Sequence, residues 1–494
     1  MKRRIAAFGL TLSLLLSAAQ AGAEAPIVVN PDSAPATAAE TAAMADAVLQ
    51  ETMENPEILS RFTDEVTVAT EVIPSESYAD VQLPVHTLSR GGKELRFLKE
   101  TLGKADESGQ YPLYITLHGG GGAPEEFNND QWLEMFYYYR AGVDNGIYVS
   151  VRGVSDTWDL HFREETYPLL DALITYMTAA EHADPNRVYL LGFSAGGDGV
   201  YQLAPRLADR FAAVNMSSGH PNGVSLVNVA NCPICLQTGI RDYYSESARR
   251  SLRCAEFEKT LDDYREKYAF GYEHRIWIHV PEGHNYVDYE DTRSTVLADP
   301  EAFAEREEAE DMLTAMLQLT QEQLGTDDIG DLSYWPCGNN EEFDEAVTRL
   351  VSGVFGLELA EANTNAVRWV SQHVRNPVPP EVVWDLGTRA AGREVTSWYW
   401  LEADPSVNEG TIRGSFDSAG NTYTVVPDEA VNGDFTILFL AGMVDTGRPV
   451  TVVTPEGEYT MQVNPSEEMI RESFLERMDP DMVCVGKIRY SELK

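Results

Sequence analysis

Positive charge, cysteine and long apolar runs are all scarce in this sequence. Its 494 residues contain 37 Lys and Arg against 79 Asp and Glu, which gives a formal net charge of −42. Such a charge repels polyanions, so neither nucleic acid nor an anionic membrane surface is expected as the main partner. The simplest interpretation is a solvated acidic surface on a protein that works in a salty or extracellular setting.

Only one apolar run is long enough to discuss, and it lies at the N-terminus. Lys2, Arg3 and Arg4 precede a short apolar core from Ile5 to Leu16, and small residues suited to cleavage follow. The run is too short for a stable membrane-spanning helix, so residues 1–23 are predicted to be a secretory signal peptide. An uncleaved anchor is the minority alternative. The protein is expected to be exported, to the periplasm or beyond, without membrane insertion after cleavage.

The five cysteines form no obvious framework. Cys232 and Cys235 make a CxxC at the start of an apparent strand, where three residues span about 10 Å, too far for a disulfide between them. With no second Cys or His pair near it, the motif is weak evidence for zinc. The odd count leaves at least one thiol free or paired with another molecule. No metal or organic cofactor is expected.

Changes of pattern divide the rest of the chain into four parts. Residues 24–75 are rich in Ala, Glu and Thr and predict a loosely packed helix with a linker. Residues 76–290 alternate apolar strands with helices, which predicts a mostly parallel sheet covered on both faces. Residues 291–375 indicate an acidic helical insertion, either a lid or only packing. Residues 376–494 hold short, closely spaced strands, which predicts a smaller β-sandwich-like domain.

The stretch GFSAGGDG supplies the strongest candidate for chemistry. Ser194 lies two residues from Gly192 and from Gly196, with the apolar run RVYLLGF before it and a helical pattern after it. A G-x-S-x-G pattern between a strand and a helix is typical of a nucleophile elbow, where larger neighbours would collide. The amide of Ala195 would then be placed to stabilise an oxyanion. The alternative is a glycine-rich turn, but it lacks the lysine of a P-loop.

A second oxyanion donor is expected from the loop LHGGGG. Glycines let backbone amides approach a developing negative charge closely, so Gly120 or Gly121 is the expected donor. His118, at the start of this loop, is expected to shape it instead of transferring protons. Trp158 follows another strand and is a candidate wall of the pocket, although a buried tryptophan is the alternative.

The acid and base follow from the chain order Ser…Asp…His. Asp242 comes just after the strand that ends at Gly239, where a carboxylate could orient an imidazole. Its rivals are Glu246, farther into the loop, and Asp198, which lies in the first turn of the elbow helix and is better explained there by the helix dipole.

His284 follows Gly283 in the loop after the next strand and is the favoured base. His279 lies within that strand and His274 precedes it. His220 in SSGHPNG is near the edge of the sheet and is a candidate for lining the pocket.

These motifs carry a resemblance to a known family. The runs LHGGGG, DPNRVYLLGFSAGGDGVYQLAPR, SSGHPN, TGIRD and EGHNY resemble secreted polyhydroxybutyrate-depolymerase-like esterases of the α/β-hydrolase superfamily, over residues 80–290. The segments RNPVPPEVVW and DTGRPVTVV resemble the β-domain attached to one branch of them. The acidic insertion is longer than that branch would suggest, and the CxxC is a further departure from it. The resemblance implies an α/β-hydrolase fold and a serine triad at Ser194, Asp242 and His284, with the loop 118–122 beside them.

The expected function is therefore an exported serine hydrolase that cleaves a small or polymeric carboxylic ester through an acyl-enzyme. A prolyl-oligopeptidase-like peptidase shares the same elbow and is the first alternative. A non-catalytic binding protein, in which the β-domain carries the function, is the second. The oligomeric state and the identity of the ester stay open, because fold resemblance does not supply a substrate.

Overall fold

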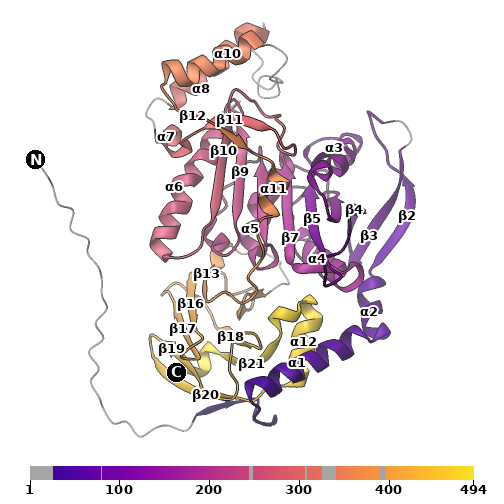
Figure 1. The fold of residues 1–494 in the computed structure, drawn as a ribbon, viewed down its shortest axis with the longest axis vertical. Helices are drawn as coiled ribbons and strands as arrows, with labels where there is room; N and C mark the ends of the chain where they lie inside the picture. The colour runs from indigo at the N-terminus through magenta and orange to yellow at the C-terminus, as the bar shows by residue number, and fades with distance from the viewer. Residues whose placement is uncertain are drawn as a thin grey trace, which may run out of the picture.

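The computed structural model describes residues 26–78, 81–243, 249–305, 309–324, 341–388 and 396–493 (Figure 1). The predicted signal peptide, Glu246 and Cys337 lie outside these ranges. No helix among the described residues is both long and apolar enough to cross a membrane.

An eleven-stranded sheet forms the centre of the described part. Its order is β12-β11-β10-β9-β8-β7-β5-β6-β4-β3-β2. The six strands from β10 to β6 run parallel, and the outer strands at both ends are antiparallel to their neighbours. The strands are β2 (Val66–Val72), β3 (Gln82–Arg90), β4 (Lys93–Leu102), β5 (Tyr111–Leu117), β6 (Gly146–Val151), β7 (Ala183–Phe193), β8 (Ala213–Ser217), β9 (Ile234–Gly239), β10 (His274–His279), β11 (Arg293–Leu297) and β12 (Leu359–Asn363).

The eight strands from β3 to β10 define the fold. Read along the sheet, their order β3-β4-β6-β5-β7-β8-β9-β10 has the second strand antiparallel and one exchange of neighbours, between β5 and β6. This is the α/β-hydrolase arrangement, so the predicted fold class is confirmed. The parallel strands are mostly apolar because helices cover both faces.

Side-chain alternation along β5 separates the two covered faces. Ile115 packs into the core that holds the buried faces of α4 (Thr166–Glu181), α5 (Ala195–Leu207) and α6 (Arg250–Tyr268). Its neighbour Tyr114 packs on the other face, in the core lined by α3 (Glu125–Tyr138) and α11 (Ala366–Val370). Successive residues of a strand point to opposite faces, which is why one strand serves both cores.

Two smaller sheets form the C-terminal unit. One has the order β1-β20-β19-β17-β16-β13, with β1 at Ile27–Val29, and the other β14-β15-β18-β21, and α12 (Glu467–Arg477) precedes the last strand. Aromatic rings such as Trp400, Tyr423 and Phe439 contact one another between the sheets, as in a sandwich. The strands are β13 (Glu381–Asp385), β14 (Ser397–Trp398), β15 (Leu401–Ala403), β16 (Thr411–Asp417), β17 (Thr422–Pro427), β18 (Phe435–Leu440), β19 (Val450–Thr454), β20 (Gly457–Val463) and β21 (Cys484–Arg489).

The N-terminal stretch differs from the predicted loose helix and linker. Strand β1 (Ile27–Val29) pairs in parallel with β20, and β2 adds an edge strand to the central sheet. Helix α1 (Ala38–Met53) begins with a capping box and lies beside α12, as Figure 1 shows, and α2 (Pro56–Thr63) follows it. The first described residues are therefore built into both units of the molecule.

The acidic insertion is not made of helices alone. It contains α7 (Pro300–Ala304), α8 (Ala309–Leu324) and α10 (Glu341–Arg349), but β11 and β12 also extend the central sheet. In Figure 1, α8 and α10 lie at one end of the molecule and the C-terminal unit lies at the other.

Candidate active site

Ser194 occupies a sharp turn between β7 and α5. Its backbone has a φ of 58°, a left-handed conformation that is rare for a residue with a side chain. Its amide donates a hydrogen bond of 2.9 Å to the carbonyl of Ser217 on the neighbouring strand. A Cβ on Gly192 would lie 2.2 Å from the Gly196 carbonyl oxygen, and one on Gly196 would lie 2.0 Å from that of Leu117. Both glycines are therefore required by the elbow.

His284 lies against Ser194, in the loop after β10. Its Nε2 is 2.9 Å from Ser194 Oγ, and its Nδ1 is 2.9 Å from Asp242 Oδ2. A carboxylate only accepts hydrogen bonds, so Nδ1 carries a proton and Nε2 is free to accept the hydroxyl proton of Ser194. The structure thus brings together the three residues predicted as nucleophile, acid and base.

Asp242 is fully buried just beyond β9. Its Oδ2 also accepts a hydrogen bond of 3.0 Å from Thr238 Oγ1, and Arg250 Nη1 lies 3.4 Å from Oδ1. Burial by itself would raise the pKa of the Asp242 carboxyl, but its interactions with His284 and Arg250 outweigh burial and hold the pKa below its usual value. The group therefore stays ionised at neutral pH, as an orienting carboxylate must.

The glycine loop lies beside the nucleophile, but one predicted donor is already bonded. The amide of Gly121 donates to Asn128 Oδ1 at 2.8 Å, which favours Gly120 of the two predicted alternatives. A Cβ placed on Gly119 would lie 3.4 Å from the Ser194 Cβ, which shows how closely the loop approaches the elbow. The Gly120 amide and that of Ala195, at the start of α5, remain the candidate donors.

His118 holds this loop from inside the protein. The Gly153 amide donates to its Nε2 at 3.0 Å, so its Nδ1 carries the proton and donates to the Gly119 carbonyl at 2.6 Å. Burial lowers the pKa of His118 well below the ordinary value, which keeps it neutral. His161 Nε2 donates in turn to the His118 carbonyl at 2.8 Å. These contacts shape the loop and leave His118 no free nitrogen for substrate chemistry.

The two predicted pocket residues have different surroundings. Trp158 is 60% exposed, and its ring meets Phe162 edge to face at 5.3 Å, so it is not the buried tryptophan of the alternative interpretation. The ring nitrogen Nδ1 of His220 lies 2.9 Å from Asn222 Oδ1. The His220 amide donates to Asp198 Oδ1 at 2.6 Å, and Asn222 Nδ2 donates to Asp198 Oδ2 at 3.0 Å. Asp198 therefore ties this loop to α5 and does not contact the base.

Some contributors to the site carry no signal in the sequence. Asn128 receives the Gly121 amide and donates to Asp156, and Ser218 Oγ donates to the His284 carbonyl at 2.8 Å. Arg250 approaches Asp242 from α6. Ser218 lies within SSGHPN, but nothing in that run points to the His284 carbonyl, and Asn128 and Arg250 belong to no motif. Only the tertiary arrangement identifies them.

The described cysteines are buried thiols. Cys232, Cys235, Cys254 and Cys484 are all free, and burial raises the pKa of each thiol above its ordinary value. The CxxC therefore forms no disulfide, as its spacing predicted. Protonated, buried thiols are poor nucleophiles, so they offer no competitor to Ser194.

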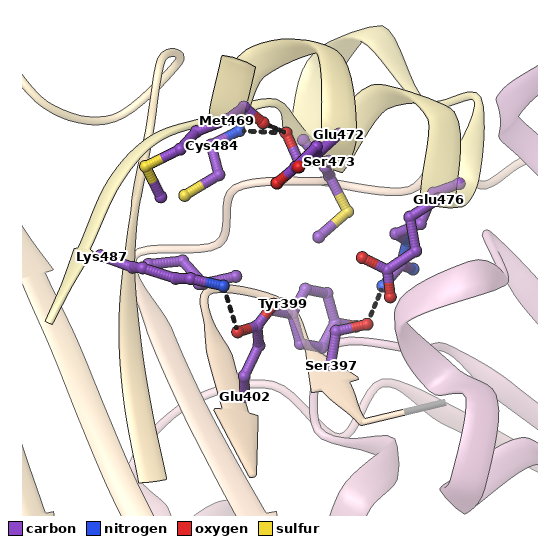
Figure 2. A pocket seen from close by; sticks show the side chains of 12 residues that line it. Ser397, Tyr399, Glu402, Met469, Glu472, Ser473, Glu476, Cys484 and Lys487 are labelled. Carbon is purple, nitrogen blue, oxygen red and sulfur yellow. Dashed lines mark hydrogen bonds and ion pairs between the residues drawn. The ribbon is translucent and has the colours of Figure 1, made fainter. Parts of the chain in front are cut away.

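Two groups of polar side chains lie elsewhere. A cavity of about 140 Å³ lies between α12 and the four-stranded sheet, and Lys487 Nζ there is 3.4 Å from Glu402 Oε2. Its lining side chains are drawn in Figure 2. Among the described residues, Glu258, Asp262 and His274 form one group close enough to hold a metal ion, but Arg265 already pairs with Asp262 at 3.0 Å. Neither group contains a residue of the Ser194–His284–Asp242 chain.

Similar proteins are found among esterases. No family model matches the chain. A protein named "Probable feruloyl esterase C" from Aspergillus terreus is 32% identical over 115 residues, which are 23% of this chain and 42% of that protein. Feruloyl esterase B from Thermothelomyces thermophilus is 30% identical over 118 residues, 22% of this chain and 39% of that protein. The chain thus spans about two fifths of the length of these relatives.

A solved structure of the poly(3-hydroxybutyrate) depolymerase LpqC from Bordetella parapertussis is also similar. It is 17% identical and covers 40% of this chain and 83% of its own, with a TM-score of 0.31. The fold assignment rests on the strand order of the chain itself and not on this score. The predicted resemblance to α/β-hydrolase esterases is confirmed by the segment shared with the esterase sequences.

Proposed function

We propose that this protein is an exported serine esterase that hydrolyses carboxylic esters through Ser194, His284 and Asp242. The observation that carries the proposal is the hydrogen-bond chain Asp242–His284–Ser194, which ends on a serine in a strained elbow. The esterase names of the similar segments support the choice of substrate class. Residues 76–290 would hold the catalytic domain, and cleavage of a signal peptide after Ala23 would precede export.

The chemistry follows from the geometry. Ser194 Oγ attacks the ester carbonyl carbon while its proton passes to His284 Nε2, and Asp242 stabilises the imidazolium that forms. The Ala195 and Gly120 amides would donate to the oxyanion. Collapse of this intermediate breaks the ester C–O bond, and His284 gives its proton to the leaving alcohol. Water, deprotonated by His284, then attacks the acyl-enzyme and releases the acid and Ser194.

The test is a panel of p-nitrophenyl esters with wild type and Ser194→Ala. The variant is expected to lose at least about 10³-fold in kcat/KM and all labelling by a fluorophosphonate. Ser352→Ala is the matched control, because its hydroxyl donates only to the Thr348 carbonyl on the helical insertion. Unchanged labelling in Ser194→Ala would contradict the assignment.

Peptide anilides run beside the esters separate the esterase from the peptidase alternative, since a peptidase would turn over the anilides. The non-catalytic alternative predicts neither turnover nor labelling. The convergence of the three side chains within hydrogen-bond reach argues against it. Determination of the N-terminus of the exported protein tests the signal peptide, with Glu24 expected as the first residue.

A further inference from the structure

A row of polar side chains crosses the core of the central sheet. His279 on β10, Gln237 on β9, and Asn215 and Ser217 on β8 are all essentially inaccessible to solvent. The remaining residues of these strands are mostly apolar, as in buried parallel strands generally. Burying polar groups costs free energy unless each is hydrogen-bonded, so a set retained here must be paired.

The pairing has a single direction. His279 Nε2 donates to Gln237 Oε1 at 3.0 Å, Gln237 Nε2 to Asn215 Oδ1 at 2.8 Å, and Asn215 Nδ2 to Ser217 Oγ at 2.9 Å. Ser217 Oγ then donates to Asp288 Oδ2. A carboxylate can only accept, so the chain must end there, and this end fixes the orientation of every amide before it.

Ser194 and His284 are both held by residues at the end of this hydrogen-bond chain. The Ser217 carbonyl accepts the Ser194 amide at 2.9 Å and so holds the elbow. Asp288 lies four residues after His284 in the same loop and is fully buried. Ser218 Oγ donates to the His284 carbonyl at 2.8 Å, which is a second tie between β8 and this loop.

A third element fixes Asp288 on the face of the sheet where the Ser217 side chain lies, since Tyr139 Oη is 3.1 Å from Ser217 Oγ. Tyr139 is the residue after α3, and its Oη donates a hydrogen bond of 3.0 Å to Asp288 Oδ2. The Asp288 carbonyl accepts the Ala366 amide, at the start of α11, at 2.7 Å. The carboxylate of Asp288 thus joins the strand behind the nucleophile to the Tyr139 segment, and its backbone carbonyl joins the loop of the base to α11.

We propose that Asp288 is a positioning residue for the esterase reaction, which locks the His284 loop to the strand that supports Ser194 so that Nε2 and Oγ stay in hydrogen-bond contact. This inference rests on the proposed function. A displacement of about 1 Å between reacting groups can cost about 10²-fold in rate while substrate binding is little affected. The role therefore predicts a defect in kcat and not in KM.

The experiment compares wild type, Asp288→Ala, Asp288→Asn and Tyr114→Phe on a short p-nitrophenyl ester, with active sites counted by fluorophosphonate. Asp288→Ala is expected to lower kcat per active site 10- to 100-fold with KM within threefold. Asp288→Asn keeps an oxygen that can accept from Ser217, so it should recover most of the rate, to within about fivefold of wild type. It also keeps the proposal testable if the alanine variant fails to fold.

Tyr114→Phe removes a hydroxyl from the same sheet, but that hydroxyl is bonded to Ser371 and not to the His284 loop. It should stay within twofold of wild type. A folded Asp288→Ala with kcat within twofold of wild type would overturn the inference, as would a loss that tracks only the number of active sites. A wild type that turns over no ester would overturn the proposed function and this inference together, so the two failures are distinguishable.

Discussion

Gly196 sets the distance between the elbow and the strand beside it. A Cβ at this position would lie 2.0 Å from the Leu117 carbonyl oxygen, and backbone cannot move aside as a flexible side chain can. Gly196→Ala is therefore expected to destabilise the protein by about 3 kcal/mol or more and to abolish ester turnover. Urea unfolding and the ester assay measure the two effects.

Gly353 provides the comparison for that substitution. A Cβ there would meet nothing within 4 Å, so Gly353→Ala should leave turnover unchanged and alter the unfolding free energy by no more than about 1 kcal/mol. An active, fully stable Gly196→Ala would show that the elbow tolerates a side chain at this position.

The protonation of Asp288 should make the free energy of unfolding depend on pH. Burial raises its pKa to about 6, despite the hydroxyls that donate to it. The unfolded chain releases this proton near pH 4 and the folded protein only near pH 6, so stability from this group is present below pH 4 and lost as pH rises through 6. Relative to that of Asp288→Asn, the free energy of unfolding of wild type should decrease by about 3 kcal/mol between pH 4 and pH 7.

Urea unfolding of both proteins at several pH values measures this difference. A constant difference across the range would show that Asp288 titrates like an exposed aspartate. Asp288→Asn should thus be relatively more stable at neutral pH while turning over ester more slowly. That combination is typical of a group retained for function at a cost in stability.

Chain order and local pattern were enough to predict the central residues of the site. Ser194 is marked by glycines whose spacing the elbow requires, and Asp242 and His284 each follow a recognisable strand. The choice between Gly120 and Gly121 stayed open in the sequence because the partner of the Gly121 amide, Asn128, lies in a helix with no motif. The direction of a single backbone N–H bond depends on tertiary contacts, and a local sequence pattern does not predict these contacts.

At the level of elements, the helical insertion contacts the segment that carries Asp242, the proposed acid. Glu310 on α8 pairs with Arg249 and accepts a hydrogen bond from Tyr243 Oη, on either side of residues 244–248. The Arg241 guanidinium lies 5.0 Å from the centre of the Phe343 ring on α10. The insertion therefore supports the Asp242 segment.

Glu310→Ala tests this support. The variant is expected to lower kcat about threefold through looser placement of Asp242, with little loss of stability because the pair is partly exposed. Glu345→Ala, which removes an exposed partner of Arg349 on the same insertion, should leave kcat unchanged. Equal rates for the two variants would indicate that the insertion does not act on the acid.

Elements with strong local periodicity could be predicted, and those held by distant pairing could not. The parallel strands and their helices follow from apolar runs of the right length. Strand β1 has three residues and pairs with a strand more than 430 residues away. Strand β2 is a mostly exposed edge strand within the stretch that is rich in Ala, Glu and Thr. Strands β11 and β12 were missed because acidic helices dominate the sequence between them.

In the whole molecule, a buried cluster of charges joins the helices of the central sheet to the C-terminal unit. Arg477 at the end of α12 pairs with Asp209, which follows α5, at 2.7 Å. Arg375 pairs with Asp479 at 2.5 Å and donates to the Asp209 carbonyl at 2.8 Å. All four residues are buried, so each charge depends on its partner.

Removal of one partner should therefore weaken the whole protein and not only one unit. Asp479→Asn leaves the Arg375 charge buried without its carboxylate and is expected to cost about 3 to 5 kcal/mol. Burial acts to raise the pKa of Asp479, but the charges of Arg375 and Arg477 outweigh it and hold the pKa below its usual value. Its stabilisation is thus present above about pH 4 and lost as pH falls below that value.

Wild type and Asp479→Asn should be unfolded at several pH values between 3 and 7. The difference between their free energies of unfolding should be largest at neutral pH and should decrease in acid. Asp263→Asn is the matched control, because Asp263 pairs with Lys259 on the surface and its loss should cost at most about 1 kcal/mol. If the cluster binds the two units, Asp479→Asn lowers the midpoint of one shared transition. If the C-terminal unit alone unfolds in a separate, earlier transition, the central sheet is stable without the buried charge cluster.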